Sequence, residues 1–279
     1  YPRQDQARQQ DVEFISASEP QYTFSSPECR HSTLYMEKRA VEGEPTVFSE
    51  TFEFTANGEW HNLKPEDVQP YDTTTALYKE YTAEREKHIV FSPRLRELAA
   101  KLTAGETNPY LKAKRIFRWV NDNFPWASAR EYSTIENIPE YVLDNRHGDC
   151  GQVSLLFITL CRISGIPAHF QSGFMMHPRA WNLHDWAEVY FEGVGWVPAD
   201  QSFGIPAFAR NADEEYFFLG GIDSWRMIVN TDYGMPLQPE KQYPRSETVD
   251  FQRGEVEWEG GNLYFPQWDY HMDIDYLNY

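Results

Sequence analysis

The stretch 149–200 constrains the fold more than any other part of the chain. Asp149 and Gln152 have the spacing of a capping box, which predicts that a helix begins at Cys150, and Gly165-Ile166-Pro167 marks its end. Between these signals apolar residues recur at helical spacing: Val153, Leu156, Phe157, Leu160, Cys161 and Ile163. Two alternating runs around a glycine-containing turn then predict a β-hairpin. A capped amphipathic helix next to a hairpin predicts a helix packed on an antiparallel sheet.

Cys150 heads the apolar stripe of this predicted helix, at its first turn. Unpaired amides and the positive end of the helix dipole stabilise a thiolate there, and they can also hold a developing oxyanion. A free cysteine is more commonly a small buried side chain, and that interpretation suits Cys161. Position alone leaves Cys150 open to either role.

The hairpin brings a histidine and a carboxylate into register. A three-residue loop centred on Glu192 places His184 directly opposite Asp200 on one face, with Cβ atoms about 4.5 to 5.5 Å apart. A carboxylate beside an imidazole fixes its tautomer and supports its charged form. Cys150, His184 and Asp200 therefore form a candidate set of nucleophile, general acid/base and orienting carboxylate.

Other polar residues near this set are weaker candidates for a catalytic or metal-binding role. His147 could pair with Cys150 on a metal, but the remaining ligands of a zinc site are not nearby in sequence. His169 and His177 lack a carboxylate at comparable geometry, which disfavours them as the general base. Glu188 shares the face of His184 and is interpreted as a structural hydrogen-bonding partner. No metal and no cofactor are expected.

Four ordered motifs in this region resemble the transglutaminase-like domain, a branch of the papain-like cysteine-enzyme superfamily. They run from about Arg146 to Gly204, and two preceding helices extend the likeness to Ser92. The motifs are Gly148-Asp149-Cys150, Gly165-Ile166-Pro167-Ala168, His184-x-Trp186-x-Glu188-Val189 and Gly195-Trp196-Val197-Pro198-x-Asp200. His169 departs from the pattern, because relatives often have Arg there.

The resemblance implies a catalytic triad of Cys150, His184 and Asp200 that acts on amide bonds of a protein or peptide substrate through a thioester. Water would then complete a peptidase or amidase reaction, and an amine would complete a transglutaminase reaction. No calcium-site signature is present, which favours hydrolysis. The alternative from another class is a non-catalytic binding module that keeps the fold.

Composition narrows the possible partners. Lys and Arg number 25 against 43 Asp and Glu, giving a net charge of −18. This charge disfavours nucleic acid and anionic lipid as binding partners. No apolar run approaches the roughly 18 residues that a membrane span needs. Three cysteines are too few for a disulfide framework, although a Cys29–Cys161 bridge stays open.

The rest of the chain is predicted in four parts. Residues 1–20 are polar and expected to be poorly structured, and residues 21–75 are strand-rich. Residues 76–220 form the catalytic core, with a helix from Ser92 to near Gly105 and another from Asn108 to Pro125. Residues 221–279 are strand-rich, with a hairpin around 259–262, and extend or cover the sheet.

These parts together predict an α+β protein: a cysteine-bearing helix on an antiparallel sheet, flanked by strand-rich N- and C-terminal segments. The chain opens with Tyr1-Pro2-Arg3 and not with Met. An exported mature form would begin in this way, as would a trimmed piece. We therefore expect an extracytoplasmic protein, periplasmic, cell-surface or secreted, whose oligomeric state is open.

Overall fold

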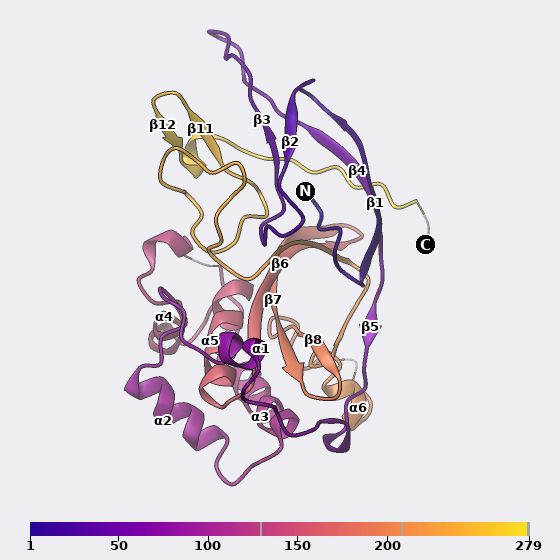
Figure 1. The fold of residues 1–279 in the computed structure, drawn as a ribbon, viewed down its shortest axis with the longest axis vertical. Helices are drawn as coiled ribbons and strands as arrows, with labels where there is room; N and C mark the ends of the chain where they lie inside the picture. Colours follow the sequence, from indigo (N-terminus) through magenta and orange to yellow (C-terminus); the bar gives the residue numbers. More distant parts are fainter. Residues whose placement is uncertain (129, 208, 278–279) are drawn as a thin grey trace. The chain divides into compact units, whose positions relative to one another are not determined.

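The computed structural model describes residues 1–128, 130–207 and 209–277 (Figure 1). The chain divides into two compact units, each assembled from separate stretches. Unit 1 comprises residues 1–57, 172–183 and 224–279, and unit 2 comprises residues 58–171 and 184–223. Helices and antiparallel strands are mixed, so the α+β class is confirmed. Because neither unit is one continuous stretch, the linear division into 1–20, 21–75, 76–220 and 221–279 stays a prediction.

Unit 2 contains the helices of the described chain. Figure 1 shows several of them gathered beside the hairpin of β7 (Ala180–Phe191) and β8 (Gly195–Ala199). The helices are α1 (Ala76–Tyr81), α2 (Pro93–Leu102), α3 (Pro109–Asn123), α4 (Ile138–Asn145), α5 (Cys150–Ile163) and α6 (Ala212–Glu215), with short 3₁₀ turns at Pro65–Asp67 and Tyr132–Thr134. Within the described ranges, none of the helices is long and apolar enough to cross a bilayer.

Side-chain caps explain where the three expected helices begin. Ser92 Oγ accepts from Leu95 N at 3.2 Å, and Asn108 Oδ1 accepts from Leu111 N at 3.1 Å. Asp149 Oδ1 accepts from Gln152 N at 3.0 Å. Each bond satisfies one of the amides that a helix start leaves unpaired. The predicted starts of α2, α3 and α5 are confirmed. The Gln152 side chain donates to Arg130 O at 3.5 Å and does not complete the capping box expected from the sequence.

Helices α1 and α4 were not expected from the sequence. The signal for α4 was nevertheless present, because Asn137 Oδ1 caps Glu140 N at 3.0 Å and Pro139 lies in the first turn. Helix α4 ends at Asn145, and the next residue, Arg146, adopts a left-handed conformation with φ 63°. The chain turns at this residue and continues to Cys150.

Helix α5 is the centre of unit 2. Every residue from Gly151 to Arg162 is buried, so the expectation of one buried stripe is wrong. The physical reason is that α2, α3 and α4 all pack on it. Phe157 meets Phe117 of α3 edge to face, with ring centroids 6.0 Å apart. A helix that is buried on all sides is typical of such a central position.

The hairpin of β7 (Ala180–Phe191) and β8 (Gly195–Ala199) forms with a different register from the expected one. Ala187 pairs with Ala199 and Phe191 pairs with Gly195, so the loop is Glu192-Gly193-Val194. Gly193 has φ +87°, a conformation that suits glycine at the centre of the turn. The register therefore differs by two residues from the prediction, which keeps the same side chains on each face.

Unit 1 is built from strands and extended chain. The strands β1 (Gln9–Ala17) and β4 (Glu50–Ala56) pair, as do β2 (Tyr22–Phe24) with β3 (Leu34–Met36), and β11 (Val256–Trp258) with β12 (Gly261–Leu263). The predicted C-terminal hairpin is confirmed, with a tighter turn because Trp258 pairs with Gly261. A 3₁₀ turn, Phe265–Gln267, follows it.

The expectation that residues 1–20 lack structure is wrong, because β1 lies there. Gln9 is buried, and its side chain donates to Arg3 O at 2.7 Å and Ile228 O at 2.9 Å and accepts from Ile228 N at 2.7 Å. These bonds fix a polar strand through a partner far along the chain. Local composition could not reveal them.

A four-stranded sheet has the order β10-β6-β7-β8, with β6 at Ala168–His177 and β10 at Arg226–Thr231. The short strands β5 (Glu59–Trp60) and β9 (Gly221–Ile222) pair separately in unit 2. In unit 1, Gly173 of β6 lies so close to β10 that a Cβ would stand 1.8 Å from Met227 O. Only glycine allows this approach.

The core of unit 1 combines these strands with the C-terminal segment 268–277. Its buried cluster contains Phe174, Met176, Met227, Val229, Leu237 and Phe251. Phe52 and Phe54 of β4 pack against this cluster, as do Tyr270, Met272 and Ile274. The alternation of 270, 272 and 274 is that of an extended chain with one side packed.

Candidate active site

Cys150 is the first residue of α5 and is half-buried. Its Sγ lies 3.4 Å from Asp185 Oδ2, and Asp185 directly follows His184 in β7. The helix start and the strand therefore meet at the thiol. Asp185 was not selected from the sequence.

Tyr132 links the two carboxylates around this thiol. Its hydroxyl donates to Asp149 Oδ1 at 2.6 Å and lies 3.4 Å from Asp185 Oδ2. Gly151 leaves room for this arrangement, because a Cβ there would stand 2.4 Å from Tyr132 Oη and 2.7 Å from Asp185 Oδ2. The helix cap, the tyrosine and Asp185 thus form one connected cluster.

The surroundings favour the protonated form of the Cys150 thiol. Burial raises its pKa well above the ordinary value, and the negative charges of Asp185 and Asp149 raise it further. Burial also raises the pKa of Cys161, which is fully enclosed in α5 and fits the structural role expected of it. All three cysteines are free, so Cys29 and Cys161 are not bridged.

His184 and Asp200 are in direct contact, as the sequence predicted. His184 Nε2 lies 2.7 Å from Asp200 Oδ2, and both side chains are buried. The observed register pairs Ala187 with Ala199, so Asp200 is a diagonal neighbour of His184 and not the residue opposite. The contact survives because a shift of two residues keeps both side chains on one face.

The backbone after β8 fixes the Asp200 carboxylate. Its Oδ1 accepts from Ser202 N at 3.1 Å and Phe203 N at 3.2 Å, while Oδ2 receives the imidazole. The Phe203 ring meets the His184 ring with centroids 5.3 Å apart. The loop that holds the carboxylate therefore also packs on the histidine.

A buried network supports the same face of β7. Trp186, whose ring centroid is 5.7 Å from that of His184, donates from Nε1 to Gln171 Oε1 at 2.7 Å. Gln171 Nε2 then donates to Glu188 Oε2 at 3.1 Å, and His169 Nε2 lies 3.2 Å from the same oxygen. Glu188 has the structural role expected of it. Gln171 was not identified from the sequence.

His169 occupies the position at which an arginine was expected by resemblance. Its ring meets the Trp196 ring at 4.4 Å and an angle of 73°. Together with the contact to Glu188, this contact places His169 in the packed network. Within residues 1–128, 130–207 and 209–277, no three His, Cys, Asp or Glu side chains gather as metal ligands.

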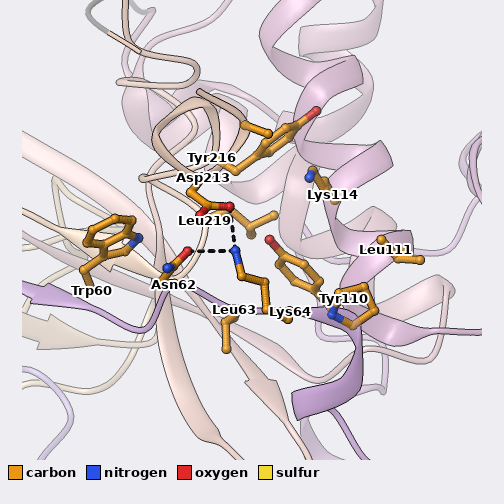
Figure 2. A pocket seen from close by; sticks show the side chains of 12 residues that line it. Trp60, Asn62, Leu63, Lys64, Tyr110, Leu111, Lys114, Asp213, Tyr216 and Leu219 are labelled. Carbon is orange, nitrogen blue, oxygen red and sulfur yellow. Dashed lines mark hydrogen bonds and ion pairs between the residues drawn. The ribbon is translucent and has the colours of Figure 1, made fainter. Parts of the chain in front are cut away.

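A separate small hollow in unit 2 shares no residue with this site. It encloses about 90 Å³ beside Tyr110 and Tyr216. Lys64 Nζ lies 2.5 Å from Asp213 and 3.3 Å from Asn62 at this hollow (Figure 2). A space of this size holds a few water molecules and no peptide.

Comparison with known proteins finds a superfamily match over the part of the chain that contains the candidate site. Residues 96–201 match the Transglutaminase-like superfamily. The matched segment contains Cys150, His184 and Asp200. The resemblance of these motifs is thereby confirmed for this part of the chain.

Two curated relatives are uncharacterized bacterial proteins. YebA of Bacillus subtilis is 27% identical over 140 residues, which are 43% of this chain and 19% of YebA. A Haemophilus influenzae protein is 26% identical over 165 residues, 50% of this chain and 42% of that protein. The chain thus spans less than half the length of either relative.

A solved structure shares the fold. A candidate cysteine protease from Cytophaga hutchinsonii superposes with a TM-score of 0.55 at 18% identity, over 83% of this chain and 73% of that one. At this identity the likeness concerns the fold alone.

Proposed function

From the membership of residues 96–201 in the transglutaminase-like superfamily, we propose that the protein is a cysteine-nucleophile enzyme that attacks amide bonds of protein or peptide substrates. The observation that carries the proposal is the 2.7 Å contact between His184 and Asp200 in the domain whose helix α5 begins at Cys150. An imidazole held by a buried carboxylate is the usual means of activating a thiol.

In the proposed mechanism, Asp200 holds His184 through Nε2, so the proton is exchanged at Nδ1. His184 accepts the thiol proton, and the Cys150 sulfur attacks the substrate carbonyl carbon. The imidazolium then protonates the leaving amine as the C–N bond breaks, which leaves a thioester.

The oxyanion would be held at the start of α5. The Cys150 backbone N–H belongs to the first turn and has no partner within the helix. Trp119 and Trp126 both lie upstream of Cys150 and could supply a second donor through the indole N–H. We propose Trp126, because its backbone forms a bridge with Gly148 just before Cys150. The Trp119 ring instead packs on Phe124 with centroids 5.1 Å apart.

Burial, together with the Asp185 carboxylate, raises the pKa of the Cys150 thiol and so favours a protonated thiol in the resting enzyme. The carboxylate lies 3.4 Å from Sγ and contributes to the raised thiol pKa. The nucleophile would therefore form only as His184 takes the proton during attack. This favours proton transfer coupled to attack over a stored thiolate–imidazolium pair.

Hydrolysis is the proposed fate of the thioester. Cys150 is half-buried as a residue, and we infer that water can approach the thioester there. A transglutaminase must exclude water long enough for an amine to react. Amine transfer stays as the alternative, and a non-catalytic binding module is the second.

Trapping the thioester tests the proposal. Incubation with a peptide amide library followed by acid quench and intact-mass measurement should show an acylated chain, with the adduct mapped to Cys150. The adduct should disappear in Cys150→Ala and persist in Cys29→Ser, a matched change at a thiol outside the site. An unmodified Cys150 under all conditions, with no amine released, would support the binding-module alternative.

Competition between acceptors then separates the two enzymatic outcomes. In H₂¹⁸O with an added primary amine, hydrolysis places ¹⁸O in the product carboxyl group, whereas transfer yields the amine conjugate. We expect mainly the ¹⁸O product.

An extracytoplasmic location is also proposed. Fractionation of the producing cells, with the chain detected by antibody, checks it. Recovery with the cytoplasmic fraction would overturn the location without affecting the chemistry.

A further inference from the structure

Unit 1 contains a wide cavity of about 2620 Å³ whose lining residues all belong to that unit. It shares no residue with the cluster around Cys150. Neither the sequence motifs nor the proposed chemistry gives it a role. A concave region of this size can accept several residues of a polymer.

Aromatic side chains form much of its wall. Tyr35, Trp225, Trp258, Trp268 and Tyr270 all line the cavity. Trp258 is 61% exposed and Tyr35 is 41% exposed, although large aromatic side chains are normally buried. Exposed aromatic groups in a concave surface mark an interaction site more often than chance packing.

The charge of the lining is strongly negative. Ten Asp and Glu residues line the cavity, against three Lys and Arg residues. Two of these three cations already have contacts: Lys38 pairs with Glu19, and the Arg253 guanidinium lies 3.4 Å from the centroid of the Phe265 ring. An occupant with positive charge would therefore be attracted, and a negative one repelled.

One strand edge is available along the cavity. All residues of β4, Glu50–Ala56, line it. Strand β4 pairs with β1 on one side, and in the part of the chain that the structure describes no strand pairs with its other side. Such an edge accepts an extended peptide by backbone pairing.

From these observations we propose that unit 1 binds an extended peptide segment rich in Lys or Arg along β4. Backbone pairing would supply affinity, the carboxylates would select the positive charge, and the aromatic residues would pack on side-chain stems and cationic groups. A neutral glycan could use the aromatic wall, but it would gain nothing from the excess of carboxylates. The inference is independent of the chemistry at Cys150.

Fluorescence anisotropy on the full chain tests the proposal. A labelled peptide of alternating Lys and Val should bind, and its Kd should rise steeply with salt because the attraction is electrostatic. A Glu-Val peptide of the same length should not compete, and neither should a neutral cello-oligosaccharide. Competition by the oligosaccharide, or equal binding of both peptides, would overturn the proposal.

Variants locate the site. Glu53→Gln removes an exposed carboxylate of β4 and should raise Kd about two- to fivefold, whereas Glu97→Gln on α2 removes an equivalent exposed charge outside the cavity and should leave Kd unchanged. Trp258→Ala should raise Kd about tenfold. Circular dichroism checks that each variant is folded. No binding of the Lys-Val peptide, or equal effects of Glu53→Gln and Glu97→Gln, would reject this site.

Discussion

The two units differ in how their residues are held in place. In unit 2, helices start at side-chain caps a few residues from the amides they bind, as with Asn108 and Leu111. In unit 1, a strand such as β1 is fixed by contacts from the other end of the chain, as with Gln9 and Ile228. Local bonds can be predicted from spacing, whereas distant ones depend on the completed fold.

The same contrast separates their proposed roles. Unit 2 places the candidate catalytic groups on a buried helix and a strand, which hold side chains in fixed positions. Unit 1 lines its cavity with exposed aromatic groups and with a strand whose edge lacks a partner in the described chain. Side chains held in fixed positions suit bond breaking, whereas a strand edge without a partner in the described chain suits the recognition of a peptide.

The largest expected effect tests whether catalysis belongs to unit 2 alone. His184→Ala and Asp200→Asn should each lower kcat for amide cleavage about 10³- to 10⁴-fold, since each disrupts the pairing that activates the thiol. Rates measured at saturating substrate check this. Tyr22→Ala, at an exposed residue of β2 in unit 1 outside the cavity, should leave kcat unchanged, and an equal loss there would break the comparison.

Core deletions compare the stability of the units. Phe157→Ala should lower the free energy of unfolding by about 3–5 kcal/mol, because Phe157 is fully enclosed in unit 2. Phe54→Ala in the half-buried β4 should cost less, about 1–2 kcal/mol. Urea unfolding followed by tryptophan fluorescence measures both. Equal losses would mean that the packing of the two units does not differ as described.

A pH profile tests the environment of the thiol. Asp185→Asn removes a negative charge 3.4 Å from Sγ and should lower the Cys150 pKa, so labelling by iodoacetamide at pH 7 should accelerate about tenfold. In the unaltered chain the labelling rate should climb only at pH above the ordinary thiol range, because the folded pKa is raised. A Cys29→Ser background keeps the signal at the site.

The surface carboxylate Asp122 offers the control for this profile. Asp122→Asn on α3 removes the same charge at a position that pairs with Arg118. It should leave the labelling profile unchanged. A profile that moves equally in both variants would indicate an effect of net charge and not of the contact with Asp185.

The smallest effect concerns a helix cap. Asn108→Ala should lower the free energy of unfolding by about 1 kcal/mol, because Leu111 N loses its acceptor, and Asn108→Asp should keep most of it. Thermal unfolding checks both variants. A neutral Asn108→Ala would show that local caps contribute less to unit 2 than its predictable helix starts suggest.

Predictability followed the same division between near and distant contacts. The helix at Cys150 and the His184–Asp200 contact could be predicted, since caps and strand alternation are local rules. The register was wrong because Gly193 in the turn and Gly195 at the start of β8 allow more than one loop. Alternation still placed both side chains on one face.

Other site residues could not be predicted. Asp185 reaches the thiol, and Tyr132 reaches Asp149 and Asp185, only when β7 and the 3₁₀ turn at Tyr132–Thr134 fold against α5. No cap or hairpin spacing connects Tyr132 with Asp149, or Cys150 with Asp185. Gln171 and Trp186 lie on consecutive strands, β6 and β7, so the strand pairing that predicted the His184–Asp200 contact could also have indicated theirs.

Gly151 turns this arrangement into a restriction on sequence change. A single methyl group there would stand 2.4 Å from the Tyr132 hydroxyl and 2.7 Å from Asp185 Oδ2. Any larger residue after Cys150 must displace the tyrosine from the helix cap, the carboxylate from the sulfur, or both. Substitutions at the neighbours of Gly151 should therefore be tolerated more readily than a substitution of Gly151 itself. A library randomised across residues 147–153 should return glycine at position 151 whenever the site stays intact.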